Sequence, residues 1–125
     1  MEIISTKNAP KSIGPFSQAI VSGDHIYCSG QIALNPETME MTGKDVAEQT
    51  QQIFTNIQAV LNSSGLELSN IIKTTVYLKD MADFKIMNSV YENKFGSHKP
   101  ARTTIEVSQL PLNAIVEIEC IASIN

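Results

Sequence analysis

The sequence contains no tryptophan, two cysteines and two histidines, and this scarcity narrows the chemistry that the chain can carry. Cys28 and Cys120 are isolated, with neither a Cys-x-x-Cys motif nor a flanking histidine. His25 and His98 lack the short-range spacing of a metal-binding pair. The pattern therefore predicts no metal site and no redox motif. We expect both cysteines to be buried thiols that pack as small apolar side chains.

Long apolar runs and an excess of positive charge are also missing. No segment approaches the roughly 18 consecutive apolar residues of a membrane-spanning helix, and residues 1–6 do not resemble a secretory signal. Nine lysines and arginines stand against thirteen aspartates and glutamates, which gives a net charge of −4. Domains that bind nucleic acid are usually basic. We therefore expect a cytoplasmic protein that acts neither on membranes nor, as its main substrate, on nucleic acid.

What the chain does have is enough apolar sequence for one core. Its 125 residues, 42% of them hydrophobic, suit one domain over residues 1–125. The spacing of apolar residues predicts the order β-β-α-β-α-β-β. The expected elements are residues 18–22, 25–29, 45–64, 71–79, 81–95, 102–107 and 115–124. This order predicts an α+β fold in which a single sheet carries two helices on one face.

Alternation along two of the predicted strands indicates which side chains face the core. In strand 71–79 we expect Ile72, Thr74, Val76 and Leu78 to lie on one face. In strand 115–124 one face is apolar and consists of Val116, Ile118, Cys120, Ala122 and Ile124. The other face is mixed and consists of Ile115, Glu117, Glu119 and Ile121. A partly wet subunit interface would accommodate such a mixed face, and an ordinary exposed sheet face is the competing interpretation.

Charged residues on the last two strands are candidates for chemistry. The planar guanidinium of Arg102 can hold a carboxylate through two parallel hydrogen bonds, although a surface ion pair with a glutamate is the more common role. Glu117 and Glu119 have Cα atoms about 6.7 Å apart on one strand face. Their repulsion can raise the pKa of one carboxyl and make it a general acid or base. A solvated acidic strip explains the pair equally well.

Asn88 and the pair Ser29-Gly30 are weaker candidates for a functional site. Asn88 interrupts the apolar stripe of the second helix, where an amide needs hydrogen-bond partners from the backbone or from a ligand. Backbone capping is its more common role. Ser29 and Gly30 end a strand, and a glycine there lets other atoms approach the backbone closely. Such a pair usually marks only a bend.

Taken together, the segments of this chain resemble the RidA (YjgF) family of reactive-intermediate deaminases. The resemblance covers nearly the whole chain and is carried by Asn8-Ala9-Pro10, Ile13-Gly14-Pro15-Phe16-Ser17-Gln18-Ala19, Ser29-Gly30-Gln31-Ile32, Asn35-Pro36, Ile72-Lys73-Thr74-Thr75-Val76-Tyr77-Leu78-Lys79-Asp80-Met81, Pro100-Ala101-Arg102-Thr103-Thr104-Ile105-Glu106-Val107, Leu110-Pro111 and Val116-Glu117-Ile118-Glu119. The combination and order of Pro-Ala-Arg-Thr and Glu-Ile-Glu are the most specific part.

The resemblance implies a chorismate-mutase-like α+β fold that assembles as a homotrimer with three clefts between subunits. It also implies hydrolysis of enamines and imines, namely 2-aminoacrylate (2-iminopropanoate) and 2-iminobutanoate, to 2-oxo acids and ammonia without a cofactor. Pyridoxal-phosphate-dependent dehydratases release these intermediates and are the implied functional partners. Because one fold serves several functions, a ligand-sensing regulator, a holdase-like binder and an endoribonuclease remain alternatives.

The resemblance also assigns roles to single residues. Arg102 matches the family's carboxylate-binding arginine, and Glu117 matches the glutamate that orients or activates water. The positions that match the cleft lining are Phe16, Ser29, Gly30, Asn88 and Thr104. Two of them depart from the common pattern: Phe16 stands where many members have tyrosine, and Thr104 where several have cysteine. We expect activity to survive both changes.

Overall fold

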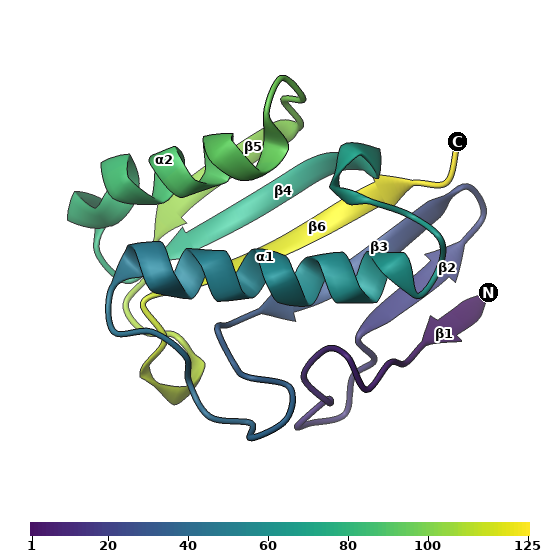
Figure 1. Cartoon of the computed structure of the whole chain (residues 1–125), viewed down its shortest axis with the longest axis horizontal. Helices are drawn as coiled ribbons and strands as arrows, with labels where there is room; N and C mark the ends of the chain where they lie inside the picture. The colour runs from purple at the N-terminus through teal and green to yellow at the C-terminus, as the bar shows by residue number, and fades with distance from the viewer.

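The computed structural model describes all 125 residues, and its strands form one six-stranded mixed sheet (Figure 1). Along the chain the elements are β1 (Glu2–Ile4), β2 (Ala19–Ser22), β3 (His25–Gln31), α1 (Val46–Asn62), β4 (Ile71–Leu78), α2 (Phe84–Phe95), β5 (Ala101–Glu106) and β6 (Val116–Ser123). Across the sheet the strand order is β1-β2-β3-β6-β4-β5. The last strand in the chain therefore lies inside the sheet.

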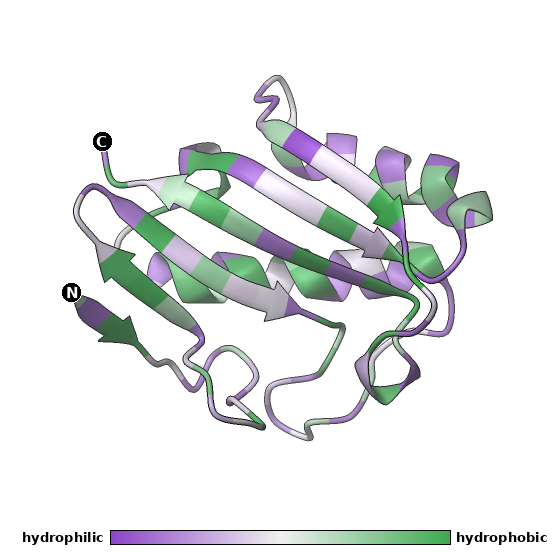
Figure 2. Ribbon diagram, turned by 180° about the vertical axis from the view of Figure 1, so that it is seen from behind, coloured by the Kyte–Doolittle hydropathy of each residue, from purple (hydrophilic) through white to green (hydrophobic).

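The strand directions explain why both helices lie on one face. β3 and β4 are each antiparallel to β6, so they run parallel to one another, and β5 is parallel to β4. α1 connects β3 to β4 and α2 connects β4 to β5. Such crossovers are right-handed, and both advance in the same direction across the sheet, so both helices cover the same face. Figure 2 shows the opposite face of the sheet without a covering helix. The predicted α+β fold with a single sheet and two helices is confirmed.

The first helix forms where its apolar periodicity predicts. Asp45 caps it, since the side-chain oxygen accepts a hydrogen bond of 2.8 Å from the backbone N–H of Glu48. Gly65, with a φ of 74°, follows its end and allows the chain to turn. The buried stripe of α1 includes Ile53, Ile57 and Leu61. No helix in the protein combines the length and the apolar character needed to cross a membrane.

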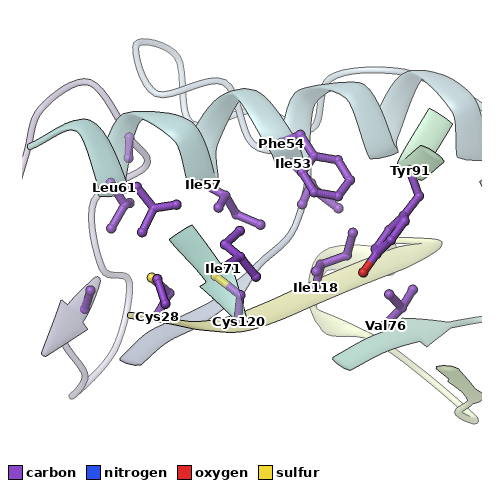
Figure 3. Packing of buried hydrophobic residues seen from close by; sticks show 14 of the residues in the cluster. Cys28, Ile53, Phe54, Ile57, Leu61, Ile71, Val76, Tyr91, Ile118 and Cys120 are labelled. Atoms are coloured by element: carbon purple, nitrogen blue, oxygen red, sulfur yellow. The ribbon is translucent and has the colours of Figure 1, made fainter. Parts of the chain in front are cut away.

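The core lies between the helices and the sheet (Figure 3). Phe54 of α1 meets Tyr91 and Phe95 of α2 edge-on, at centroid distances of 5.7 and 5.4 Å. Cys28 of β3 lies directly opposite Cys120 of β6 in the sheet register. Both are buried free thiols, as predicted, and they pack as part of this core.

The structure differs from the predicted elements at several places. β3 continues through Ser29 and Gly30 to Gln31 instead of ending at that pair. β1 was not expected, because three residues with Ile3 65% exposed carry too little pattern. Ile72 was placed on one face with Thr74, Val76 and Leu78, and this prediction was wrong: those three are fully buried, as is Ile71, while Ile72 is 43% exposed. A register shift between Ile71 and Lys73 reverses the alternation there. Ile124, expected on the apolar face, lies beyond the end of β6 and is exposed. Ile115, expected on the mixed face, lies before the start of β6 and packs against the core instead.

Candidate active site

Arg102 lies on the helix-covered face, at the outer edge of the sheet. It pairs with Thr74 in the parallel register of β4 and β5. Its Nη1 donates a hydrogen bond of 2.7 Å to Oδ1 of Asn88, and its guanidinium carbon lies 4.7 Å from the ring centroid of Tyr91. The arginine is therefore bound to an amide rather than to a glutamate. Asn88 in turn serves Arg102, whereas capping of the helix backbone was the more common role for such a residue.

Glu117 lies on the opposite, uncovered face of the sheet. Its carboxylate rests directly on the backbone of Gly30, so closely that a Cβ atom at that position would overlap it. The absence of a side chain at Gly30 is thus what admits the carboxylate, and the β3–β6 register is irregular between Cys28 and Gln31. Burial raises the pKa of Glu117, and the negative charge of Glu119 raises it further. The carboxyl is accordingly suited to both taking and returning a proton.

Glu119 differs from Glu117 although the two share a strand face. It is exposed, and its Oε1 accepts a hydrogen bond of 2.7 Å from the hydroxyl of Tyr77. That bond is the main reason why the pKa of Tyr77 is raised to about 12. Glu119 therefore has a partner within the chain, while no side-chain hydrogen bond of this kind occupies the carboxylate of Glu117. Burial contributes more to the raised pKa of Glu117 than the repulsion between the two glutamates does.

A hollow of about 430 Å³ lies beside Glu117. It is lined by Phe16, Ser29, Gly30 and Glu117, together with Pro10, Lys11, Ile13, Gln31, Ile32, Leu34 and Pro111. Three of the predicted cleft residues and the predicted acid–base residue are thus brought together. The Ser29 hydroxyl donates a hydrogen bond of 2.7 Å to the carbonyl oxygen of Ser17, which ties the loop that carries Phe16 to β3.

Gln18 also holds the loop that carries Phe16. It was not among the candidate residues predicted from the sequence. Its Nε2 donates to the carbonyl oxygens of Ala9 and Pro10 at 3.3 and 2.8 Å, and its Oε1 accepts from the N–H of Thr6 at 2.7 Å. The side chain is buried. Only the position of this glutamine between an irregular segment and a strand could have indicated its role.

A second hollow, of about 440 Å³, lies beside Arg102 and Asn88. Tyr91, Lys99 and Pro100 are among the residues that line it. Thr104 is on the same face of β5 as Arg102, two residues further along, and its hydroxyl oxygen is buried without a hydrogen-bond partner. Tyr91 was also missed as a site residue. Its spacing of three residues from Asn88 places both on one helix face and could have indicated it.

Within one chain the two hollows are separate. Glu117 pairs with Tyr77, and Tyr77 pairs with Ile105, which is three residues after Arg102. Two strand spacings separate Arg102 from Glu117 by about 10 Å across the sheet, and three residues add about 10 Å along it. An odd offset also puts the two side chains on opposite faces. A single copy of the chain therefore does not bring Arg102 and Glu117 together.

These groups define a class of protein: a small α+β fold that presents a fixed guanidinium and, separately, a carboxyl with a raised pKa beside a hollow. A guanidinium of this kind suits a carboxylate ligand, and the carboxyl suits proton transfer. The comparison with known families agrees with the resemblance seen in the sequence. The family model described as Endoribonuclease L-PSP matches residues 6–124, and the chain belongs to this family, which includes RidA and YjgF.

Individual relatives match over nearly their whole length. A RutC family protein of Pyrococcus horikoshii is 51% identical over 97% of this chain and 96% of its own. A protein of Dermatophagoides farinae named 2-iminobutanoate/2-iminopropanoate deaminase is 44% identical over 98% of this chain and 95% of its own. Among solved structures, that of the YjgF gene product from E. coli has a TM-score of 0.95 at 42% identity and covers 100% of both chains.

Proposed function

We propose that this protein hydrolyses reactive enamines and imines, namely 2-aminoacrylate (2-iminopropanoate) and 2-iminobutanoate, to 2-oxo acids and ammonia. The observation that carries the proposal is the placement of Glu117, a half-buried carboxyl with a raised pKa that lies on Gly30 beside a hollow. The name of the Dermatophagoides relative supports the same activity. Arg102 supplies the group that holds the substrate carboxylate.

The chemistry needs no nucleophilic side chain. Glu117 takes a proton from water as the water oxygen bonds to the imine carbon and the C=N electron pair moves to nitrogen. The proton is returned to that nitrogen, which gives the carbinolamine. Glu117 then moves the carbinolamine hydroxyl proton to the nitrogen as the C–N bond breaks and the C=O bond forms, so that ammonia leaves and a 2-oxo acid remains. The enzyme contributes by holding the carboxylate and by moving the proton. A raised pKa suits Glu117 to this exchange, because its carboxyl and the reacting groups are then closer in proton affinity.

The proposal includes a homotrimer. Since Arg102 and Glu117 lie on opposite faces of the sheet in one chain, a site that uses both must take them from two copies. We propose three such clefts, one at each interface, with the uncovered face turned toward neighbouring copies. The proposal also places the enzyme in the cytoplasm, beside the pyridoxal-phosphate-dependent dehydratases that release its substrates.

RNA cleavage is the second candidate, because the family model carries the name of an endoribonuclease. Imine hydrolysis is favoured on charge: the net charge is −4, and Glu117 and Glu119 lie side by side on the face that the first hollow adjoins. Carboxylates at this place repel the phosphates of RNA. Incubation with a labelled RNA, with the Glu117→Gln variant as control, tests this candidate directly.

The decisive experiment measures 2-oxobutanoate formation by a threonine dehydratase, with and without the protein. The dehydratase is present in excess, so that hydrolysis of 2-iminobutanoate limits the rate. We expect the wild-type protein to accelerate formation of the 2-oxo acid and the Glu117→Gln variant to lose most of this effect. Equal rates with and without the wild-type protein would contradict the proposal.

A further inference from the structure

Three residues of α2 surround Arg102 and indicate a role beyond the carboxylate contact assigned to the arginine itself. Phe84, Asn88 and Tyr91 are spaced by four and three residues, so they lie on one face of α2. All three contact the guanidinium: the ring centroids of Phe84 and Tyr91 lie 5.5 and 4.7 Å from its carbon, and Asn88 accepts its hydrogen bond. One helix face thus places two aromatic rings and one amide oxygen around the guanidinium.

Tyr91 is itself fixed at both ends. Its ring packs against Phe95, at a centroid distance of 4.7 Å, and against the edge of Phe54. Its hydroxyl shares a buried hydrogen bond of 2.7 Å with Oγ1 of Thr74. Thr74 is fully buried and is also the register partner of Arg102 in the adjacent strand. The phenol therefore connects the strand next to Arg102 with the helix that holds it.

This arrangement restrains the guanidinium. Stacking on an aromatic ring covers a face of the group and leaves its in-plane N–H donors accessible. Asn88 occupies only Nη1, and this is the single side-chain hydrogen bond of Arg102 within the chain. The remaining donors belong to a guanidinium that one hydrogen bond and two rings restrain, so a carboxylate meets an arginine whose long side chain is already ordered.

We propose that Tyr91, held by Thr74, is a positioning residue that orients the Arg102 guanidinium for the carboxylate of the substrate. The inference rests on the proposed function, because it presumes that Arg102 binds that carboxylate. The competing role is purely structural, since Tyr91 also belongs to the aromatic core with Phe54 and Phe95. A structural role changes stability, whereas a positioning role changes the affinity for carboxylates.

The experiment compares variants by dissociation constant for 2-oxobutanoate, measured by titration calorimetry, and by KM and kcat in the dehydratase-coupled assay. Tyr91→Phe and Thr74→Val each remove one partner of the hydroxyl pair, and Tyr91→Leu removes the ring. Leu61→Ala is the matched control, because Leu61 is fully buried in the same core but lies towards the other end of α1, away from Tyr91 (Figure 3). Thermal unfolding of every variant records the structural contribution.

We expect Tyr91→Phe and Thr74→Val to raise KM and the dissociation constant about 3- to 10-fold, with kcat changed by less than about twofold. The double variant should bind about as weakly as either single one, because both changes break the same bond. Tyr91→Leu should weaken binding by more than about tenfold. Leu61→Ala should lower the unfolding temperature and leave KM within about twofold of the wild type.

The outcomes separate this inference from the proposed function. If the wild-type protein binds 2-oxobutanoate and Arg102→Ala does not, while the Tyr91 variants bind like the wild type, the positioning role is overturned and the proposed function stands. An equal rise of KM in Leu61→Ala and Tyr91→Leu overturns it as well. If Arg102→Ala itself binds and turns over like the wild type, both the positioning role and the assigned carboxylate contact are overturned.

Discussion

The two faces of the sheet carry different kinds of side chain. On the helix-covered face the strands contribute a closed apolar core, with Arg102 at its outer edge beside α2. On the uncovered face, Tyr77, Glu117, Glu119 and Ile121 lie together without a layer above them (Figure 2). Arg102, the proposed carboxylate-binding group, is on the first face, and Glu117, the proposed proton-transfer group, is on the second. If the proposed function is right, one copy of the chain therefore holds two halves of a site rather than a whole one.

The largest expected effect comes from removing either half. Arg102→Ala and Glu117→Gln should each lose about 100-fold or more in turnover, the first through a lost charged contact and the second through a lost proton carrier. If the halves come from different copies, mixing the two inactive variants with subunit exchange should restore activity. In a random equal mixture, about a quarter of the clefts would join an intact Arg102 to an intact Glu117.

Two controls belong to this experiment: the stability of the Glu117→Gln variant and the exchange of subunits between the two variants. The pKa of Glu117 is raised in the folded state, so its charged form destabilises the fold as the pH rises through that pKa. Glu117→Gln should therefore be at least as stable as the wild type at neutral pH. Native mass spectrometry would show whether mixed assemblies form. Mixed assemblies without recovered turnover would contradict a site shared between copies.

The next effect concerns the uncovered face itself. Ile121 lies on it, between Tyr27 of β3 and Lys73 of β4. Ile121→Asp should lose assembly and activity together, because a charge buried in an interface costs on the order of several kcal/mol. Light scattering on a sizing column should give three protomers of 13.7 kDa for the wild type, or about 41 kDa, and a smaller mass for the variant.

A matched substitution on the other side of the molecule keeps this test specific. Ile86 is exposed on α2, away from the uncovered face, and Ile86→Asp should retain both the assembly and the activity. Circular dichroism would show that both variants are folded. A folded, monomeric Ile121→Asp with full turnover would mean that one chain suffices for catalysis.

The smallest expected effect is a shift in the pH dependence of turnover, which distinguishes the role of Glu117 from that of Glu119. The acidic limb of the turnover profile should follow the pKa of Glu117, which is above the ordinary value of 4.5. Glu119→Gln removes a neighbouring negative charge while its amide oxygen can still accept the Tyr77 hydroxyl, so it should move this limb to lower pH. Glu37→Gln, in an exposed loop, should leave the limb in place. A limb unmoved by Glu119→Gln would contradict the coupling between the two carboxyls.

Most helices and strands could be predicted from the sequence because the periodicity that indicates each of them lies within the element itself. The stripe from Ile53 to Leu61 predicts α1, and alternation along β6 separates Glu117 from the buried Ile118. The short β1 lacks such a signal. The shift at Ile71 arises from pairing with β6, which lies some 50 residues away in the chain, so alternation within β4 alone misplaced Ile72.

The candidate site could be predicted only in part for the same reason. Glu117, Gly30 and Phe16 were selected singly, but the contact of Glu117 with Gly30 depends on the irregular pairing of β3 with β6. The bond between Tyr77 and Glu119 likewise requires the register of β4 against β6. Arg102 and Glu117 lie on opposite faces because of the register across β5, β4 and β6. No pattern within a single strand reveals that register.

The position of β6 also has a consequence for how the chain acquires its shape. β3 and β4 both hydrogen-bond to β6, and no other strand lies between them. During synthesis, the first five strands can form only the separate groups β1-β2-β3 and β4-β5, since the strand that joins them is translated last. Closing these long-range pairings carries the entropy cost of the intervening chain, which slows folding. The polypeptide must therefore emerge through Ser123 before its sheet becomes continuous, so folding completes after translation of the last strand rather than alongside it.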